Sequence, residues 1–405
     1  MAEESTSRPG AAAKRGTLLG AVFLMATSAI GPGFITQTTE FTVRLGSAFA
    51  FAIVLSILLD IAVQLNVWRV IGVSGTRAQD LGNRVLPGLG SVMAVLVVFG
   101  GLVFNVGNIA GASLGLDALL GLNVKIGGAV SALIAVGVFA SRRAGVAMDR
   151  LVLVLGVLMI ALTGYVAVSS SPPVGQALRQ TVLPEQVDFL SITTLIGGTV
   201  GGYITYAGAH RLVDAGISGP ERAGEITRSS VTSLLVTGVM RIVLFLALLG
   251  VVAGGATLTT DNPTAEAFGH AAGAVGTRLF GVILWSAGIT SVIGAAYTSI
   301  SFLSTLSPSL ERARSWLVVG FVALSTVIFL VLEQAPTTLL VLAGALNGLI
   351  LPVGFGVLLW VAARRRDLLG GYHHPRWLLT IGVLAWLLTL YLGVSSLSGI
   401  AALWS

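Results

Sequence analysis

The sequence predicts an all-α membrane protein with 11 transmembrane helices and a cytoplasmic N-terminus. Only 10% of its 405 residues are charged and 55% are hydrophobic, whereas about 25% of the residues of a soluble domain are charged. The apolar residues gather in runs long enough to cross a bilayer, and the basic residues gather in alternate loops between them. The absence of cysteine excludes disulfides and thiolate metal sites.

The apolar runs define the predicted helices in order. A polar segment, residues 1–16, precedes the first run, which is long and has no small-residue cleavage site after it, so it predicts a membrane helix and not a signal peptide. Crossing a core of ~30 Å takes about 20 residues. The eleven runs are residues 17–43, 47–68, 91–119, 126–141, 150–169, 191–210, 229–254, 278–303, 316–332, 337–362 and 377–400.

Basic residues divide the loops into two classes. Eighteen of the 23 Lys and Arg residues lie in the N-terminal segment or in every second loop, and four lie in the other loops. The positive-inside rule therefore places the N-terminus in the cytoplasm and the C-terminus outside. The same asymmetry accounts for the net charge of +6, so we expect no nucleic-acid partner.

Two glycine-rich interruptions at matching places predict an inverted repeat. The first run is interrupted at Ile30–Phe34 and the sixth at Gly197–Gly202. Each is the first helix of a five-helix half, residues 17–169 and 191–362, and residues 377–400 form one extra helix. Unwound backbone at membrane depth is tolerated where it lines a binding site. A proline kink and close glycine packing are the structural alternative.

The segments at these breaks resemble the NRAMP family of divalent-metal transporters, which share the LeuT-type fold. Gly31–Phe34 lies where the family carries Asp-Pro-Gly-Asn, and Thr199–Tyr203 lies where it carries Thr-Val-Met-Pro-His or a close variant. The segments Ile57–Leu81 and Asn105–Gly121 are similar to the family's second helix with its following loop and to its third helix. The resemblance covers most of the chain and implies the fold.

The departures from the family fall on its functional positions. Its Asp, Asn, Met and His correspond here to Gly31, Phe34, Gly201 and Tyr203. Its acidic pair in the third helix corresponds to Asn105 and Asn108, which are polar or gating candidates but cannot carry protons. A dehydrated divalent cation prefers carboxylate, amide, thioether or imidazole ligands. We therefore expect no metal ligands at these positions and a different substrate.

A small organic carboxylate suits the site that remains. Half-helix N-termini present backbone N–H groups that favour anions, and glycines allow close approach. A branch of NRAMP-like bacterial proteins with Gly-Gly-Tyr-Ile-Thr at this place, as in Gly201–Thr205, is associated with 5-oxoproline metabolism, so the resemblance implies a 5-oxoproline-like substrate. The predicted substrate-binding residues are Gly31, Gly33, Phe34, Thr36, Gln37, Gly201, Gly202, Tyr203, Thr205 and Arg241.

Two charged residues lie inside predicted membrane helices. Asp60 is near the middle of the second run and Arg241 is in the middle of the seventh, the counterpart of the second in a repeat of five helices. Charges at this depth are costly and mark function by default. Two interpretations stay open, a structural ion pair and an Arg241 that attracts or gates an anionic substrate.

The eighth run contains a candidate sodium site. Its segment Ala287–Ser291 is similar to the Ala-Gly-Leu-Thr-Ser segment of sodium-coupled LeuT-type transporters. This resemblance implies that Na⁺ is bound by Thr290 and Ser291 together with carbonyl groups near Ala29, Pro32 and Ala287. Hydroxyl groups that simply bond back to the preceding turn are the alternative explanation. Proton coupling is the second candidate, and we expect no other cofactor.

These features predict a secondary active transporter in the bacterial inner membrane, acting as a monomer on a small-molecule substrate. The chain has no Gly-x-x-x-x-Gly-Lys-[Ser/Thr] loop for an ATP-driven pump and no His-Glu-x-x-His zinc helix, so we do not expect an enzyme. One alternative is a transporter of divalent metal (Mn, Fe or Mg), proton-coupled or uncoupled. Another is a membrane protein that binds a ligand without moving it.

Overall fold

The computed structural model describes residues 29–258, 262–304, 307–332 and 334–402, without the side chains of residues 142–153. Within these ranges every regular element is a helix, as the sequence predicted. The polar N-terminal segment and the first part of the first run lie outside the described residues.

Within the described residues, each predicted run falls on a helix or on a broken pair of helices. The first half contains α2 (Pro32–Leu45), α3 (Phe49–Ser74), α5 (Leu89–Leu120), α6 (Val124–Ala140) and α7 (Arg142–Ser169). The second half contains α9 (Phe189–Thr199), α10 (Ile204–Asp214), α11 (Ala223–Ala253), α12 (Pro263–Ser304), α14 (Arg314–Val331) and α15 (Pro336–Arg364). The chain then continues through α16 (Arg376–Ser395) and α17 (Leu397–Ala402).

The number of membrane crossings stays a prediction. Seven helical segments of the described chain are long and apolar enough to span a membrane, and one of these joins α2 to α3. An eighth candidate is the bent pair of α7 and α8 (Val174–Val182), whose axes differ by 105°. Helix α6, with 17 residues, is shorter than these.

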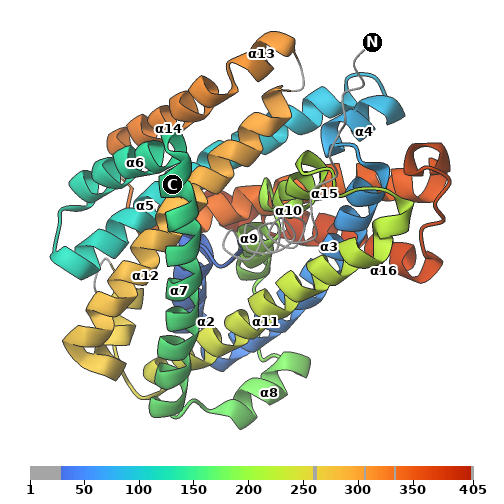
Figure 1. Cartoon of the computed structure of the whole chain (residues 1–405). Coiled ribbons are helices and arrows are strands. Elements are labelled where there is room, and N and C mark those ends of the chain that lie inside the picture. Colours follow the sequence, from blue (N-terminus) through green and yellow to red (C-terminus); the bar gives the residue numbers. More distant parts are fainter. Residues whose placement is uncertain (1–28, 259–261, 305–306, 333, 403–405) are drawn as a thin grey trace.

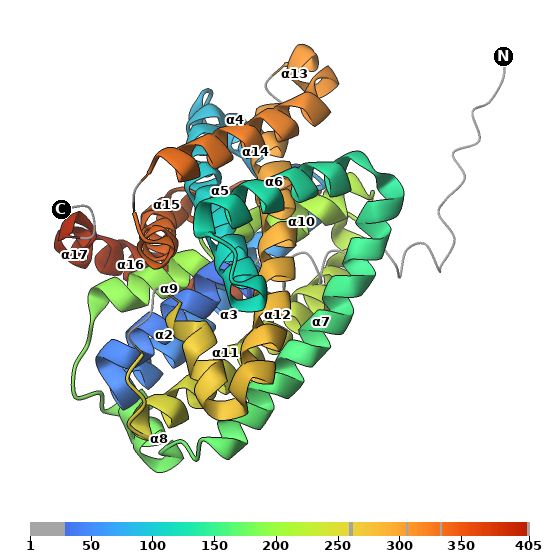
Figure 2. The same cartoon turned by 90° about the vertical axis from the view of Figure 1, so that its left-hand side faces the viewer.

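Three short helices in the loops were not predicted. They are α4 (Ala78–Val85), α8 and α13 (Pro308–Arg312). Figures 1 and 2 show α8 at one end of the molecule and both α4 and α13 at the other. Helices α4 and α13 belong to arginine-rich loops and α8 belongs to an arginine-poor one, so these three loops are placed as the predicted topology requires.

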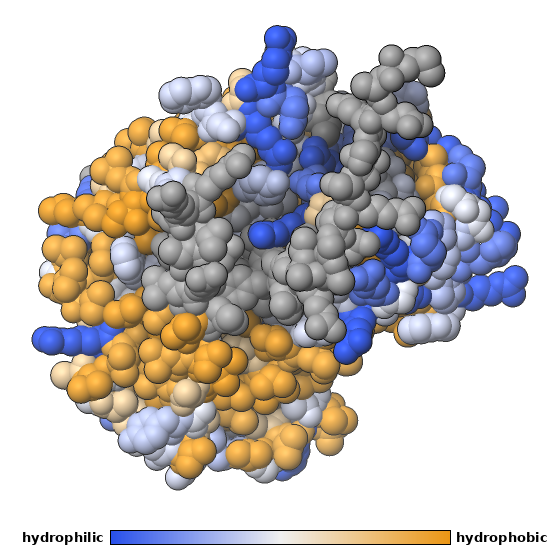
Figure 3. Space-filling view, in the orientation of Figure 1, coloured by the Kyte–Doolittle hydropathy of each residue, from blue (hydrophilic) through white to orange (hydrophobic). Residues whose placement is uncertain are grey.

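The outer surface is apolar where helices face outward. Figure 3 shows apolar side chains over much of the lower and left part of one face, with polar side chains gathered at the top and right. Leu133 on α6 and Val168 on α7 are 73% and 82% exposed. Such surfaces match the hydrocarbon of a bilayer and not water.

Glycines let the central helices approach closely. A β-carbon on Gly115 of α5 would lie 2.4 Å from the backbone nitrogen of Trp285 in α12, and one on Gly288 would lie 2.6 Å from the Ala112 side chain. On the other side of the core, a β-carbon on Gly197 of α9 would lie 1.9 Å from the carbonyl oxygen of Gly344 in α15. Small residues at such crossings are typical of membrane helix packing, and they hold α5, α12, α9 and α15 around the two breaks.

Candidate functional site

The first break lies at Ile30 and Gly31, directly before α2. Pro32, Gly33 and Phe34, which the sequence placed in the interruption, form the first turn of α2. Proline is well suited to this position because its missing N–H would have no partner in the helix. The Pro32 ring packs against α5, where a β-carbon on Gly111 would lie 2.1 Å from it. The first-turn N–H groups of α2 therefore start at the face of α5.

The second break begins later than predicted. Helix α9 continues through Gly197 and Gly198 to Thr199, and Val200–Tyr203 separates it from α10. Gly197 packs closely against α15, and Gly198 packs against the Gln37 side chain of α2. Gly202 has a φ of +57°, a left-handed conformation that favours glycine. The hydroxyl group of Thr205 donates a hydrogen bond to the carbonyl oxygen of Val200 across the break.

Residues from both breaks meet around α5 and α15. The Gln37 side chain of α2 donates to the carbonyl oxygen of Leu340 at 2.8 Å. A β-carbon on Gly33 would lie 3.4 Å from the ring of Phe104 in α5, and that ring meets Tyr203 edge-on with centroids 5.5 Å apart. Among the predicted residues, Phe34, Thr36, Gln37, Tyr203 and Thr205 are each no more than 2% exposed.

The donors around this point are neutral. Among the described residues, no group of three or more His, Asp or Glu side chains is placed to hold a metal ion. The breaks offer backbone N–H and carbonyl groups, hydroxyls and amides, beside the aromatic rings of Phe34, Phe104 and Tyr203. Such a set can bind a carboxylate through N–H groups or a monovalent cation through oxygen atoms.

Asp60 and Arg241 form an ion pair between α3 and α11. The Arg241 Nη2 atom lies 2.5 Å from Oδ2 of Asp60, and both side chains are enclosed between α3 and α11. The remaining polar atoms, Asp60 Oδ1 and Arg241 Nε and Nη1, have no hydrogen-bond partner in the described part of the chain. The ion pair is therefore formed, and no hydrogen bond among the described residues joins Arg241 to either break.

The two predicted asparagines lie on α5 and face different surroundings. Asn105 donates through Nδ2 to the Ser325 hydroxyl of α14 at 3.2 Å. Asn108 is 2% exposed, and its Nδ2 has no partner among the described residues. Asn105 thus links α5 to α14.

The candidate sodium residues lie close to the first break. Gly288 of α12 packs on Ala112 and Pro32 packs on Gly111, so both segments touch neighbouring residues of α5. Thr290 bonds back to the carbonyl oxygens of Ser286 and Ala287 at 3.0 and 3.1 Å, as the alternative explanation requires. The buried Ser291 hydroxyl has no partner among the described residues, and Ala29 is fully buried.

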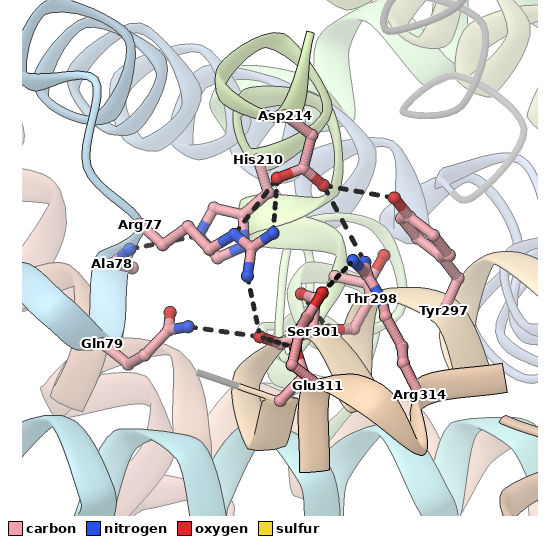
Figure 4. Close-up of polar contacts among 11 residues, drawn as sticks. Arg77, Ala78, Gln79, His210, Asp214, Tyr297, Thr298, Ser301, Glu311 and Arg314 are labelled. Atoms are coloured by element: carbon pink, nitrogen blue, oxygen red, sulfur yellow. Dashed lines mark hydrogen bonds and ion pairs between the residues drawn. The ribbon is translucent and has the colours of Figure 1, made fainter. Parts of the chain in front are cut away.

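A polar network lies at the arginine-rich end of the molecule (Figure 4). Asp214, the last residue of α10, accepts hydrogen bonds from Arg77 at 2.6 Å and from the Tyr297 hydroxyl of α12 at 3.2 Å. Arg314 of α14 lies 3.9 Å from the same carboxylate and covers the Tyr297 ring. One carboxylate therefore joins α10 to the segment before α4, to α12 and to α14.

His210 adds a second contact beside Asp214. Its Nε2 atom accepts a hydrogen bond from the backbone N–H of Ala78, the first residue of α4, at 3.1 Å. The imidazole ring packs against Phe302 with centroids 5.0 Å apart. His210 and Asp214 are close in the sequence, whereas their partners come from distant segments of the chain.

Three residues at the breaks were missed by sequence reasoning. They are Phe104, Leu340 and Asn347. Asn347 donates to the carbonyl oxygens of Gly100 and Ala343 at 3.0 and 2.8 Å. A buried asparagine inside the tenth apolar run was the available signal, because polar residues at membrane depth are costly. Phe104 and Leu340 carry no such signal.

Comparisons with known proteins agree with this architecture. The family model described as natural resistance-associated macrophage protein-like, Nramp, matches residues 22–399. The chain is 53% identical over 389 residues to the uncharacterized membrane protein YcsG of Bacillus subtilis, with 96% of both chains covered. It is 50% identical over 383 residues to an uncharacterized membrane protein of Haemophilus influenzae, with 95% of both chains covered.

Solved structures share the fold at low sequence identity. A variant of the manganese transporter of Eremococcus coleocola superposes with a TM-score of 0.75 at 16% identity, covering 98% of this chain and 90% of that one. MhsT in complex with L-phenylalanine superposes with a TM-score of 0.66 at 14% identity, covering 93% of this chain and 98% of that one.

Proposed function

The chain belongs to the Nramp family of membrane transporters, and from this premise we propose that it moves a small organic carboxylate by alternating access, with sodium as the coupling ion. The observation that carries this proposal is the chemistry of the two breaks. Gly31, Phe34 and Gly201 supply no side-chain ligand where a dehydrated divalent cation needs one. The groups present at the breaks are instead backbone N–H groups and the aromatic rings of Phe34, Phe104 and Tyr203.

The carboxylate binds at the starts of the two half-helices. The first-turn N–H groups of Gly33 and Phe34 in α2 and the backbone around Gly202 before α10 favour an anion. Phe104 and Tyr203 then contact the carbon skeleton. A molecule of the size of 5-oxoproline has both the carboxylate and the small apolar ring that this surface accommodates.

Alternating access follows from the grouping of helices. Helices α2, α3, α9, α10 and α11 form one moving unit, and α5, α6, α12 and α14 form the unit against which it turns. Asp214 belongs to the first unit, whereas Tyr297 and Arg314 belong to the second. Release into the cytoplasm then requires these contacts to separate, so the network acts as the inner gate.

Sodium binds beside the first break in this proposal. Ser291 supplies a buried hydroxyl, Thr290 supplies a second, and the carbonyl groups of Ala29, Pro32 and Ala287 complete a neutral oxygen set. Proton coupling is the alternative, and it has less support because the family's acidic pair is replaced by Asn105 and Asn108.

Divalent-metal transport is the second candidate, and the comparisons favour it over an organic carboxylate. The structures that share the fold include manganese transporters from Eremococcus coleocola. In this candidate, carbonyl groups and the amide of Gln37 hold a partly hydrated ion, which needs fewer protein ligands than a dehydrated one.

Thermal stability of the purified protein separates the two candidates, because a specific ligand raises the melting temperature by mass action. We expect a saturable rise with 5-oxoproline that Na⁺ enhances, and no comparable rise with Mn²⁺ or Mg²⁺. The double variant Gly31→Asp with Phe34→Asn restores two of the family's ligands. Gly31 has a φ of −71°, which aspartate also adopts. This variant should therefore gain a rise in melting temperature with Mn²⁺. A rise with Mn²⁺ alone in the unaltered protein would overturn the carboxylate proposal.

Uptake into proteoliposomes then separates transport from binding alone. We expect radiolabelled 5-oxoproline to accumulate when an inward Na⁺ gradient is imposed and to stop accumulating when the gradient is collapsed. Binding of 5-oxoproline without uptake would instead support the alternative of a membrane protein that binds a ligand without moving it.

A further inference from the structure

Two buried side-chain amides stand at the α9–α10 break with their orientation fixed. Gln37 of α2 donates through Nε2 to the carbonyl oxygen of Leu340 at 2.8 Å. Asn347 of α15 donates through Nδ2 to the carbonyl oxygens of Gly100 and Ala343. Because backbone carbonyls only accept hydrogen bonds, these contacts assign the NH₂ groups and leave the amide oxygens on the opposite side.

Both amide oxygens point at the broken segment and lack a donor. A β-carbon on Gly198, one residue before the end of α9, would lie 2.2 Å from Oε1 of Gln37. A β-carbon on Gly202, inside the break, would lie 1.8 Å from Oδ1 of Asn347. Both side chains are fully buried, and neither oxygen has a hydrogen-bond partner in the described part of the chain.

Unpaired buried acceptors are rare in native proteins and point to a missing ligand, water or ion. In this conformation Gln37 Oε1 rests against Gly198, and Asn347 Oδ1 rests against both Gly202 and Gly100, whose Cα–H groups are at most weak donors. The amides come from α2 and α15, so they approach the break from two different helices.

We infer that the transported molecule carries an N–H group and that Gln37 Oε1 and Asn347 Oδ1 recognise it. This inference rests on the proposed function and narrows its substrate class. The carboxylate occupies backbone N–H groups at the half-helix starts, and it cannot satisfy an acceptor oxygen. An N–H group on the same molecule can donate to these oxygens. The substrate is therefore a small carboxylate with a nearby lactam, amide or amine nitrogen. Asn347 is a specificity-determining residue.

The test compares two ligands that differ only at this group. 5-Oxoproline has a lactam N–H, and tetrahydro-5-oxofuran-2-carboxylate has a ring oxygen in its place with the same charge and nearly the same shape. We expect the lactam to stabilise the protein at a concentration about tenfold or more below that of the lactone, because a site built to bind N–H rejects the analogue that lacks it.

Two variants and a matched control assign the effect to these oxygens. Gln37→Met and Asn347→Leu each remove one acceptor with little change in size, so each should lower the lactam-to-lactone ratio, and the double variant should bring it close to one. Asn66→Leu is the control, because Asn66 is equally buried and also donates to two backbone carbonyls, but it contacts Leu378 and not the break. Its ratio should equal that of the unaltered protein.

The ratio is measured within each variant, so a loss of stability alone does not change it. Equal binding of lactam and lactone by the unaltered protein would overturn the inference and leave the carboxylate proposal standing. A preserved ratio in Gln37→Met and Asn347→Leu would overturn the role of these residues. Response to neither carboxylate would mean that the proposed function itself fails, and this inference with it.

Discussion

Asp60 and Arg241 carry opposite charges inside the protein with side chains only 2% and 1% exposed. Removing one partner of a buried pair leaves the other charge unpaired and typically costs about 3–5 kcal/mol. We expect Asp60→Asn and Arg241→Gln each to lower the melting temperature and the yield of purified protein. Asp60→Leu combined with Arg241→Met should be more stable than either single variant, since it removes both charges.

An exposed pair provides the control for this prediction. Arg365 and Asp367 lie 2.8 Å apart at the surface, so Asp367→Asn should change the melting temperature little. If Arg241→Gln instead kept the melting temperature and abolished transport, the pair would act on the substrate, as the second interpretation of Arg241 requires.

His374, in the loop between α15 and α16, gives the protein a pH dependence. Burial, with a smaller effect of Arg69, lowers the pKa of this imidazole from 6.5 to about 4. Asn66 uses its NH₂ group to donate to Ala62 and Leu378, so its oxygen accepts from Nε2–H of a neutral His374 at 2.8 Å. Between pH 6.5 and about 4 the unfolded chain binds a proton that the folded protein does not.

The contribution of His374 to the free energy of unfolding is therefore fully present above pH 6.5, and it decreases as the pH drops toward 4. His374→Gln keeps a side-chain donor for Asn66 but does not titrate. We expect the melting temperature of the unaltered protein to fall more steeply over this range than that of the variant. Parallel curves would show that His374 is not the titrating group.

At the scale of elements, the break between α9 and α10 depends on Gly202. Its φ of +57° and the oxygen of Asn347, 1.8 Å from where a β-carbon would lie, both oppose a larger residue. Gly216 has a similar φ of +68° with no atom within 4 Å of that position. We expect Gly202→Ala to abolish ligand-induced stabilisation and uptake, whereas Gly216→Ala should show only the cost of its backbone conformation, about 1–2 kcal/mol.

The inner network predicts a change in accessibility. Asp214→Asn removes the charge that joins Arg77, Tyr297 and Arg314, so the cytoplasmic end should open more often. A change of about 1 kcal/mol in the free energy of opening changes the ratio of open to closed protein about fivefold. In the cysteine-free chain, Thr298→Cys reports this as a faster reaction with maleimide in inside-out vesicles. Asp367→Asn should leave that rate unchanged, and an unchanged rate in Asp214→Asn would contradict the gate.

The elements that the sequence predicted are those set by local composition. Long apolar runs and the glycine–proline step before α2 fix helices and a break regardless of their partners. The second break begins three residues after its predicted start because Gly197 packs against α15 and Gly198 packs against Gln37 of α2. Only the tertiary structure separates packing glycines from unwinding ones. The short helices α4 and α13 and the contacts of Asp214 depend on segments far apart in the chain, so their arrangement left no local pattern.

For the whole molecule, the alternation of basic residues and the positions of the short helices agree on sidedness. Arg312 and Arg314 flank the end of α13 at the same end of the molecule as α4, and Arg179 on α8 lies at the other. Because the positive-inside rule acts on short loops, α13 should face the cytoplasm and α8 the outside. We expect the two helix breaks to lie between these surfaces.

The absence of cysteine allows a direct test of this orientation. We expect Gln176→Cys on α8 to react with a membrane-impermeant maleimide in intact bacteria, since its side chain is exposed. Ser309→Cys on α13, also exposed, should react only after the cells are permeabilised. The reverse pattern would invert the topology, and with it the direction in which separation of the Asp214 network opens the two helix breaks.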